Sequence, residues 1–155
     1  MAENQIKFQS ILPIWMLLYF SHFILLFLTL TLLIDTILIY LLLKYFQIKM
    51  KSEVFIRTIV MAWILGFSAE IISLIFLQLM GIFFKEVDCY NIYSNGISVS
   101  THLATVVISI VLTFFLTRFL FLKVAISRSN AFIMAIILSI LSAPWLFIVP
   151  TNTLY

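Results

Sequence analysis

The stretch that decides the fold is "THLATVVISIVLTFFLTRFLFLK", residues 101–123, which is almost entirely apolar. A helix that crosses a bilayer needs about 20 mostly apolar residues, so this stretch predicts a membrane-spanning helix. A hydroxyl side chain nevertheless stands at every fourth position, and an arginine follows the last of them. This row, which we call the hydroxyl ladder, consists of Thr101, Thr105, Ser109, Thr113 and Thr117, and the arginine is Arg118.

The composition of the whole chain supports a membrane environment. Of its 155 residues, 65% are hydrophobic and 10% are charged, whereas soluble domains have roughly 45–50% apolar and about 25% charged residues. A small soluble domain cannot bury that much apolar surface. We therefore expect lipid around most of the chain, no sizeable soluble domain and no enzyme with a globular active site. The net charge of +3 lies in clusters between apolar runs, which favours membrane topology over nucleic-acid binding.

The apolar stretches predict an all-α integral membrane protein, a four-transmembrane-helix bundle formed by a single domain over residues 1–155. As one helix, residues 11–46 would be roughly 54 Å long, far beyond a hydrocarbon core of about 30 Å. We therefore expect a short N-terminal segment, residues 6–20, to lie at the membrane interface before the first span. The predicted spans are 21–44, 58–84, 101–122 and 131–150, and the predicted outer loop is 85–100.

Basic residues predict the orientation. Those that flank the first and third connections are Lys44, Lys49, Lys51, Arg57, Arg118, Lys123 and Arg128. Since basic residues concentrate on the cytoplasmic side of a membrane, we expect these two connections in the cytoplasm and both termini outside. We expect the membrane to be the plasma membrane.

The predicted outer loop contains two features of interest. The pair Asn95-Gly96 suits a type I′ turn, so we expect either a small hairpin or an irregular loop. Cys89 is the chain's one cysteine, and it is either an ordinary loop residue or the partner of a cysteine in another chain. His102 is predicted to lie in a solvated interfacial position, as is His22.

Three charged residues are predicted to lie within the membrane. At about 1.5 Å per residue, Asp35 lies roughly 13 Å deep counted from Lys44, and Glu70 roughly 20 Å deep counted from Arg57. With Ile126 taken as the membrane edge, Arg118 lies roughly 12 Å deep. Because their depths match, we expect an ion pair between Asp35 and Arg118. In the alternative, Arg118 extends to the headgroups and Asp35 is neutral and bonded to a threonine.

Glu70 has no basic residue at its own depth. It shares one helical face with Gly66, Ala69 and Ser73, and small residues at this spacing allow close helix contact in a membrane. We therefore expect Glu70 to face protein. It would serve as a proton or cation site, as a charge offered to a partner subunit, or as a protonated carboxyl bonded within the bundle.

The hydroxyl ladder predicts a helix-packing ridge rather than a channel lining. Four residues turn a helix by about 400°, so each step of the ladder drifts about 40° around the helix. Serine and threonine also commonly donate to their own i−4 carbonyls. A second packing face is predicted at Ala135, Ser139 and Ala143. Pro144 follows this row and is predicted to kink the same helix near its outer end.

No sequence motif for catalysis, metal binding or a cofactor is present. We therefore expect a non-enzymatic subunit or accessory protein of a membrane assembly, with a membrane protein partner or self-association. The alternative is an oligomeric transporter or channel that uses Glu70 as its proton or cation site. An intramembrane lipid-modifying enzyme is the weaker alternative, since Asp35 and Glu70 are the one conceivable carboxylate pair.

Overall fold

The computed structural model describes residues 21–89 and 92–144, with side chains from Leu28 onward. The part of the chain so described is helical, with four α-helices and one short 3₁₀ helix. These elements are α3 (Ser21–Tyr45), α4 (Ser52–Phe83), η1 (Ile92–Ser94), α5 (Gly96–Lys123) and α6 (Arg128–Leu141).

The structure confirms the all-α prediction and three of the apolar spans by length and composition. Helices α3, α4 and α5 are long and apolar enough to cross a membrane, which suggests a membrane protein. Helix α6 has 14 residues, so its length is about 21 Å and a bundle of four full spans is not confirmed. The predicted interfacial segment 6–20 and residues 145–150 of the predicted fourth span lie outside the described residues.

The end of α6 differs from the prediction at Pro144. We expected this proline to kink the predicted fourth span near its outer end. In the structure α6 ends at Leu141, three residues before the proline, and the residues after Pro144 lie outside the described part of the chain. The backbone N–H of Ser142 closes the last turn by donating to the carbonyl of Leu138 at 2.8 Å. A proline disfavours the helical conformation of the residue before it, which accounts for a helix that stops ahead of Pro144.

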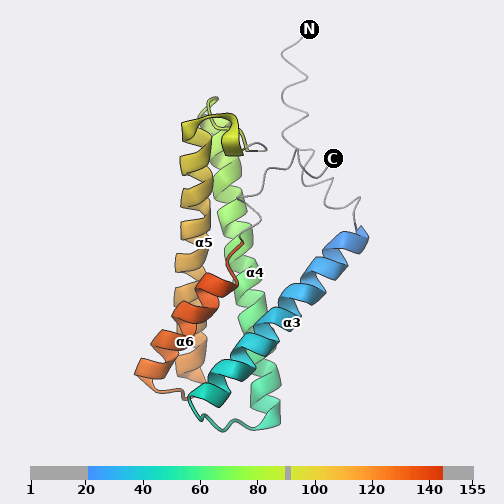
Figure 1. Ribbon diagram of the computed structural model, residues 1–155, viewed down its shortest axis with the longest axis vertical. Coiled ribbons are helices and arrows are strands. Elements are labelled where there is room, and N and C mark those ends of the chain that lie inside the picture. The colour runs from blue at the N-terminus through green and yellow to red at the C-terminus, as the bar shows by residue number, and fades with distance from the viewer. Residues whose placement is uncertain (1–20, 90–91, 145–155) are drawn as a thin grey trace.

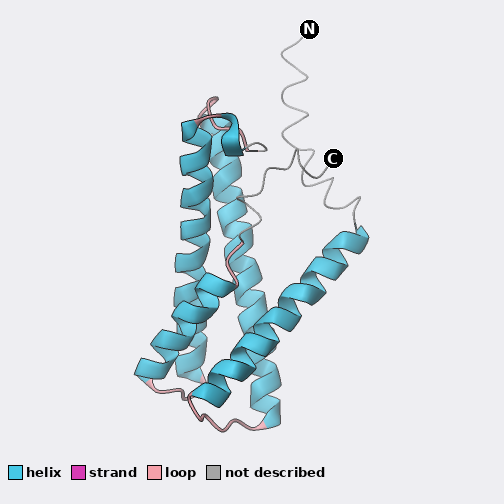
Figure 2. Cartoon of the chain, in the orientation of Figure 1, coloured by secondary structure: helices cyan, strands magenta, loops and turns pink. Residues whose placement is uncertain are grey.

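The four helices form a bundle that is thicker at one end (Figures 1 and 2). Helices α4 and α5 run antiparallel, lie side by side toward the loop at their upper ends and diverge toward their lower ends. Helix α6 packs against the half of α5 near its C-terminus, and α3 crosses α4 at an angle and diverges from it toward the N-terminus of α3. We call the end with the α3–α4 and α5–α6 connections the basic end, and the end with the α4–α5 connection the loop end.

The apolar core lies at the basic end, where all four helices meet. It is formed by Ile39, Leu42, Leu43, Ile59, Ala62, Phe121, Ile126, Ala131, Met134, Ala135 and Leu138. Toward the loop end, the buried residues between α4 and α5 are mainly small or hydroxyl-bearing, such as Ala69, Ser73 and Thr105. The two halves of the bundle are therefore held together by different chemistry.

Two matching turns join the helices at the basic end. Gln47 and Ala125 follow the ends of α3 and α5 with φ of 55° and 63°. After each of them, the next residue donates its N–H back into the helix: Ile48 to Leu43 and Ile126 to Phe121. This is the Schellman arrangement, in which glycine is usual at the left-handed position. Buried Ile126 then adds its side chain to the core.

The loop end is held by the residues that start α5. Asn95 is the N-cap of α5, and its side-chain oxygen accepts from the N–H of Ser98 at 2.7 Å. Its amide donates to the carbonyl of Glu86 at 2.6 Å, and the Ser98 hydroxyl accepts from the N–H of Asp88 at 2.8 Å. The pair Asn95-Gly96 therefore starts a helix instead of forming a hairpin turn, and no described residue of this loop is in a strand.

Candidate functional site

The most buried charged side chain is that of Asp35, in the middle of α3. It is 7% exposed, and the hydroxyl of Ser142 donates to its Oδ1 at 2.5 Å. Ser142 caps the C-terminus of α6, so this bond links α3 to the end of α6 through two residues that are 107 positions apart along the chain. The end of α6 thus lies beside a carboxyl group inside the bundle.

Glu70 projects from α4 into the same region. The carboxyls of Asp35 and Glu70 lie within electrostatic range of each other, although no hydrogen bond joins them. Glu70 makes no side-chain hydrogen bond within the described residues. Nearby, the indole of Trp63 donates to the hydroxyl of Thr31 at 3.1 Å and ties α4 to α3. The structure therefore places the carboxyls of Asp35 and Glu70 close enough to interact electrostatically, a relation that the sequence supported only weakly.

Arg118 lies elsewhere, in the seam between α5 and α6. The carbon atom of its guanidinium is 5.5 Å from the ring centre of Phe132 and 6.0 Å from that of Phe114. Its Nε is buried and has no hydrogen-bond partner. The structure thus gives Asp35 and Arg118 different partners and shows no ion pair between them in the described chain. Asp35 does bond to a hydroxyl, as the alternative expected, but the hydroxyl is that of a serine.

The hydroxyl ladder is buried along its whole length, and its five members are at most 6% exposed. Thr101, Thr105 and Thr117 each donate to the carbonyl four residues earlier, at 2.7–2.8 Å. These bonds follow the pattern expected for hydroxyls in membrane helices. Ser109 differs, because its Oγ is buried and has no partner.

The expected packing face of α4 is divided in the structure. Ala69 and Ser73 are buried against the bundle, and Ser73 donates to the carbonyl of Ala69. A Cβ on Gly66, however, would meet nothing within 4 Å. Gly66 therefore makes no close contact with another helix of the described part of the chain. On α6, Ala135 and Ser139 are buried, while Ala143 lies beyond the helix and is partly exposed.

The close glycine contact is made by Gly81 instead, a residue that the sequence analysis did not single out. A Cβ on Gly81 would collide with Sγ of Cys89, and the thiol donates to the carbonyl of Leu77 at 3.4 Å. Burial, together with the charge of Asp88, raises the pKa of the Cys89 thiol. Cys89 therefore locks the loop onto the end of α4.

His102 is buried, not solvated as predicted. It is 4% exposed, and its Nδ1 lies 2.8 Å from the carbonyl oxygen of Ser98. Because a carbonyl only accepts, Nδ1 must carry the proton in this contact. One turn of α5 thus supplies the histidine with its hydrogen bond, which the sequence spacing alone did not reveal.

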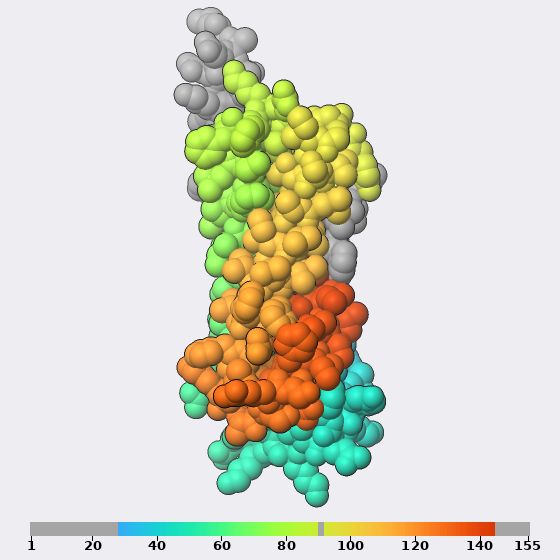
Figure 3. All heavy atoms as spheres, turned by 90° about the vertical axis from the view of Figure 1, so that its left-hand side faces the viewer, coloured from blue at the N-terminus to red at the C-terminus, as the bar shows by residue number. Residues whose placement is uncertain are grey.

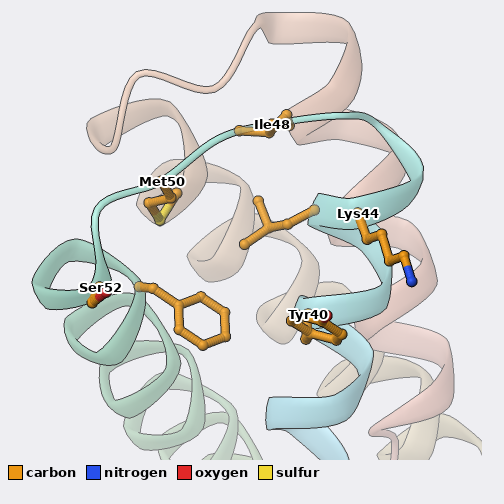
Figure 4. Close-up of a pocket in the computed structure, with 7 residues that line it drawn as sticks. Tyr40, Lys44, Ile48, Met50 and Ser52 are labelled. Atoms are coloured by element: carbon orange, nitrogen blue, oxygen red, sulfur yellow. The ribbon is translucent and has the colours of Figure 1, made fainter.

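A pocket of about 340 Å³ lies at the basic end, in the angle between α3 and α4. Figure 4 shows Tyr40 and Lys44 of α3 on one side, with Met50 and Ser52 across from them. Leu43, Ile48 and Phe55 complete its lining, and the Tyr40 and Phe55 rings meet edge to face at 6.5 Å. It contains none of the predicted site residues.

Chemically, the described residues offer a carboxyl pair and an unpaired guanidinium. They contain no group of three or more histidine, cysteine or carboxylate side chains able to hold a metal ion.

No protein-family model, no curated protein and no solved structure matches this chain.

Proposed function

We propose that this chain is a non-enzymatic subunit or accessory protein of a larger assembly in the plasma membrane, with both termini outside. The observation that carries the proposal is the unfilled side of α4 around Gly66 and Glu70. No described residue lies within 4 Å of a Cβ built on Gly66, and Glu70 has no hydrogen-bond partner in the described residues. A small residue beside a carboxyl group is the combination that supports close, polar helix contacts in membranes.

The shape of the bundle supports the same proposal. Helix α3 diverges from α4 toward its N-terminus, and α6 covers α5 only near the basic end (Figure 1). Among the described residues, the halves of α4 and α5 toward the loop end therefore have few neighbours besides each other. A helix of a partner protein, or of a second copy, would complete the bundle there.

The test is co-purification in mild detergent with a matched pair of variants. Gly66→Leu fills the unfilled side of α4 and is expected to release the partner. Ser68→Leu adds similar bulk on an exposed side of the same helix, where the serine donates only to the carbonyl of Ile64, and should retain it. If the wild-type chain retains no partner, or if both variants retain it equally, the proposal fails.

A second candidate is an oligomeric transporter or channel, which the Asp35–Glu70 pair favours. Two nearby carboxyls in a membrane can share one proton, because repulsion disfavours the doubly charged state. In liposomes, this candidate predicts proton or cation flux that Glu70→Gln abolishes. The control is Glu53→Gln at the exposed start of α4, which should leave the flux intact. Absence of flux in the wild-type protein rejects this candidate. An intramembrane lipid-modifying enzyme has no further observation in its favour.

A further inference from the structure

The guanidinium of Arg118 is held in place by two aromatic rings. Phe114 lies one turn before it on α5, and Phe132 comes from α6; the two rings meet edge to face with centres 5.5 Å apart. The positive group lies over both rings, which is a favourable cation–π geometry. Figure 3 shows the α5–α6 side of the molecule, where this seam runs between the two helices. Arg118 is therefore a positioned group, not a freely rotating surface side chain.

This positioned charge lacks an anion. In the described chain no carboxylate lies within ion-pair distance of Arg118, and its Nε is buried without a partner. Asp35 is engaged by Ser142, and Glu70 lies near Asp35. Cation–π contacts offset only part of the cost of an unpaired guanidinium in a membrane. An anion from outside the chain would balance the charge.

The position of Arg118 indicates which anion. Helix α5 has 28 residues and is therefore about 42 Å long, more than the roughly 30 Å of a hydrocarbon core. Arg118 is five residues from the C-terminus of this helix, about 7.5 Å along its axis. The basic residues at this end of α5 predict that it lies at the cytoplasmic membrane surface, and from about 7.5 Å inside that end a long arginine side chain reaches the phosphate layer.

The neighbouring residues complete a site for a phospholipid. Arg128, exposed at the start of α6, lies one turn from Phe132 on the same helix face, so a second basic residue shares the face that carries Phe132. On the membrane side of Arg118, Val111 and Phe115 of α5 are 45% and 59% exposed and offer an apolar surface to acyl chains. Guanidinium groups bind phosphate oxygens in a bidentate manner. We propose that Arg118 and Arg128 bind the phosphate of one anionic phospholipid in the seam between α5 and α6.

The experiment measures how lipids stabilise the full-length protein in detergent. Phosphatidylglycerol is titrated against wild-type protein, Arg118→Gln and the matched control Lys123→Gln, with thermal unfolding as the readout. Lys123 lies at the same end of α5, but its ammonium lies over Phe119, about 140° around the helix from Arg118. The Arg118 variant should need at least about tenfold more lipid for the same stabilisation, since charged hydrogen bonds are lost. Lys123→Gln should match the wild type.

Further arms separate the other sources of an anion. Phosphatidylcholine and inorganic phosphate should stabilise the wild type clearly less than phosphatidylglycerol. Should Arg118→Gln fail to fold, Arg128→Gln provides the test, because its exposed side chain is no part of the core; it should also weaken the lipid effect. Equal losses in the Arg118 and Lys123 variants would mean diffuse attraction and overturn the proposal. So would a full response to inorganic phosphate alone, or a protein partner that Arg118→Gln releases without any change in lipid binding.

Discussion

The contact between Gly81 and Cys89 can be tested with a double-mutant cycle. Gly81→Ala should lower the free energy of unfolding when Cys89 is present and should not lower it when residue 89 is alanine. In Gly81→Ala, the new Cβ would approach Sγ of Cys89 to well under 3.0 Å, a separation that real Cβ atoms essentially never show. Overpacking of this kind costs about 1–3 kcal/mol, whereas alanine gains up to about 1 kcal/mol over glycine in a helix. The net expectation is a loss of up to about 2 kcal/mol in the free energy of unfolding.

In the Cys89→Ala background the same substitution should be harmless. The nearest side-chain atom would then be Cβ of residue 89, at 3.9 Å, which is an ordinary van der Waals distance. Only the helix gain of up to about 1 kcal/mol remains, so the coupling energy between the two sites should be about 1–3 kcal/mol. Thermal or denaturant unfolding of the four proteins in detergent measures it.

Thiol chemistry gives this cycle an independent readout. Only the thiolate reacts with maleimide, and burial raises the pKa of the Cys89 thiol. Less thiolate is therefore present at any given pH, and the wild-type rate should stay low at neutral pH and rise at higher pH. Gly81→Ala should displace the thiol and speed the reaction, whereas Gly66→Ala should not. If Gly81→Ala lowers the free energy of unfolding equally with Cys89 and with Cys89→Ala, the reasoning about this contact is refuted.

Four further outcomes are expected from thermal unfolding in detergent. Ser142→Ala should destabilise the protein by about 1–3 kcal/mol by leaving Asp35 buried without its donor. In the Asp35→Asn background the same substitution should destabilise the protein less. An equal loss of stability would contradict the hydrogen bond between Ser142 and Asp35. Ser109→Ala should be neutral or stabilising because it removes a hydroxyl with no partner; a clear loss would mean that the hydroxyl is bonded. Ala125→Gly should stabilise the protein by up to about 1 kcal/mol by relieving a left-handed backbone conformation. The control Ala135→Gly, within α6, should destabilise it. Gly66→Ala should leave the isolated chain at least as stable, since the added methyl group meets open space; a loss would disprove that space.

The long spans could be predicted because a membrane imposes a length and a composition on them. The boundary predicted near Ser21 coincides with the start of α3, and the apolar run after residue 58 lies within α4. Polar residues at the ends of the spans did not decide the local structure there. Asn95-Gly96 suits both a tight turn and a helix N-cap, and only the bonds to Glu86 and Ser98 decide for the cap.

The candidate site could be predicted only in part, because its contacts join distant positions. Depth counting placed Asp35 and Arg118 at one level but carried no information on which side of each helix faces a neighbour. The true partner, Ser142, lies 107 residues away at a helix end, and the nearby Pro144 was the one available signal that a helix stops there. Glycine spacing misled for the same reason, since among the described residues Gly81 has a close neighbour in Cys89 and Gly66 has none.

The short length of α6 has a mechanical consequence for the bundle. Near the basic end four helices share one apolar core, but toward the loop end α4 and α5 rely mainly on each other and on hydroxyls bonded within their own helix. Local opening is easiest where few apolar contacts oppose it. Amide hydrogen exchange should therefore be slowest around Phe121 and Met134 and faster in the diverging half of α3. We therefore expect the diverging half of α3 to move relative to the rest of the bundle, while the hydrogen bond between Ser142 and Asp35 holds the middle of α3 in place.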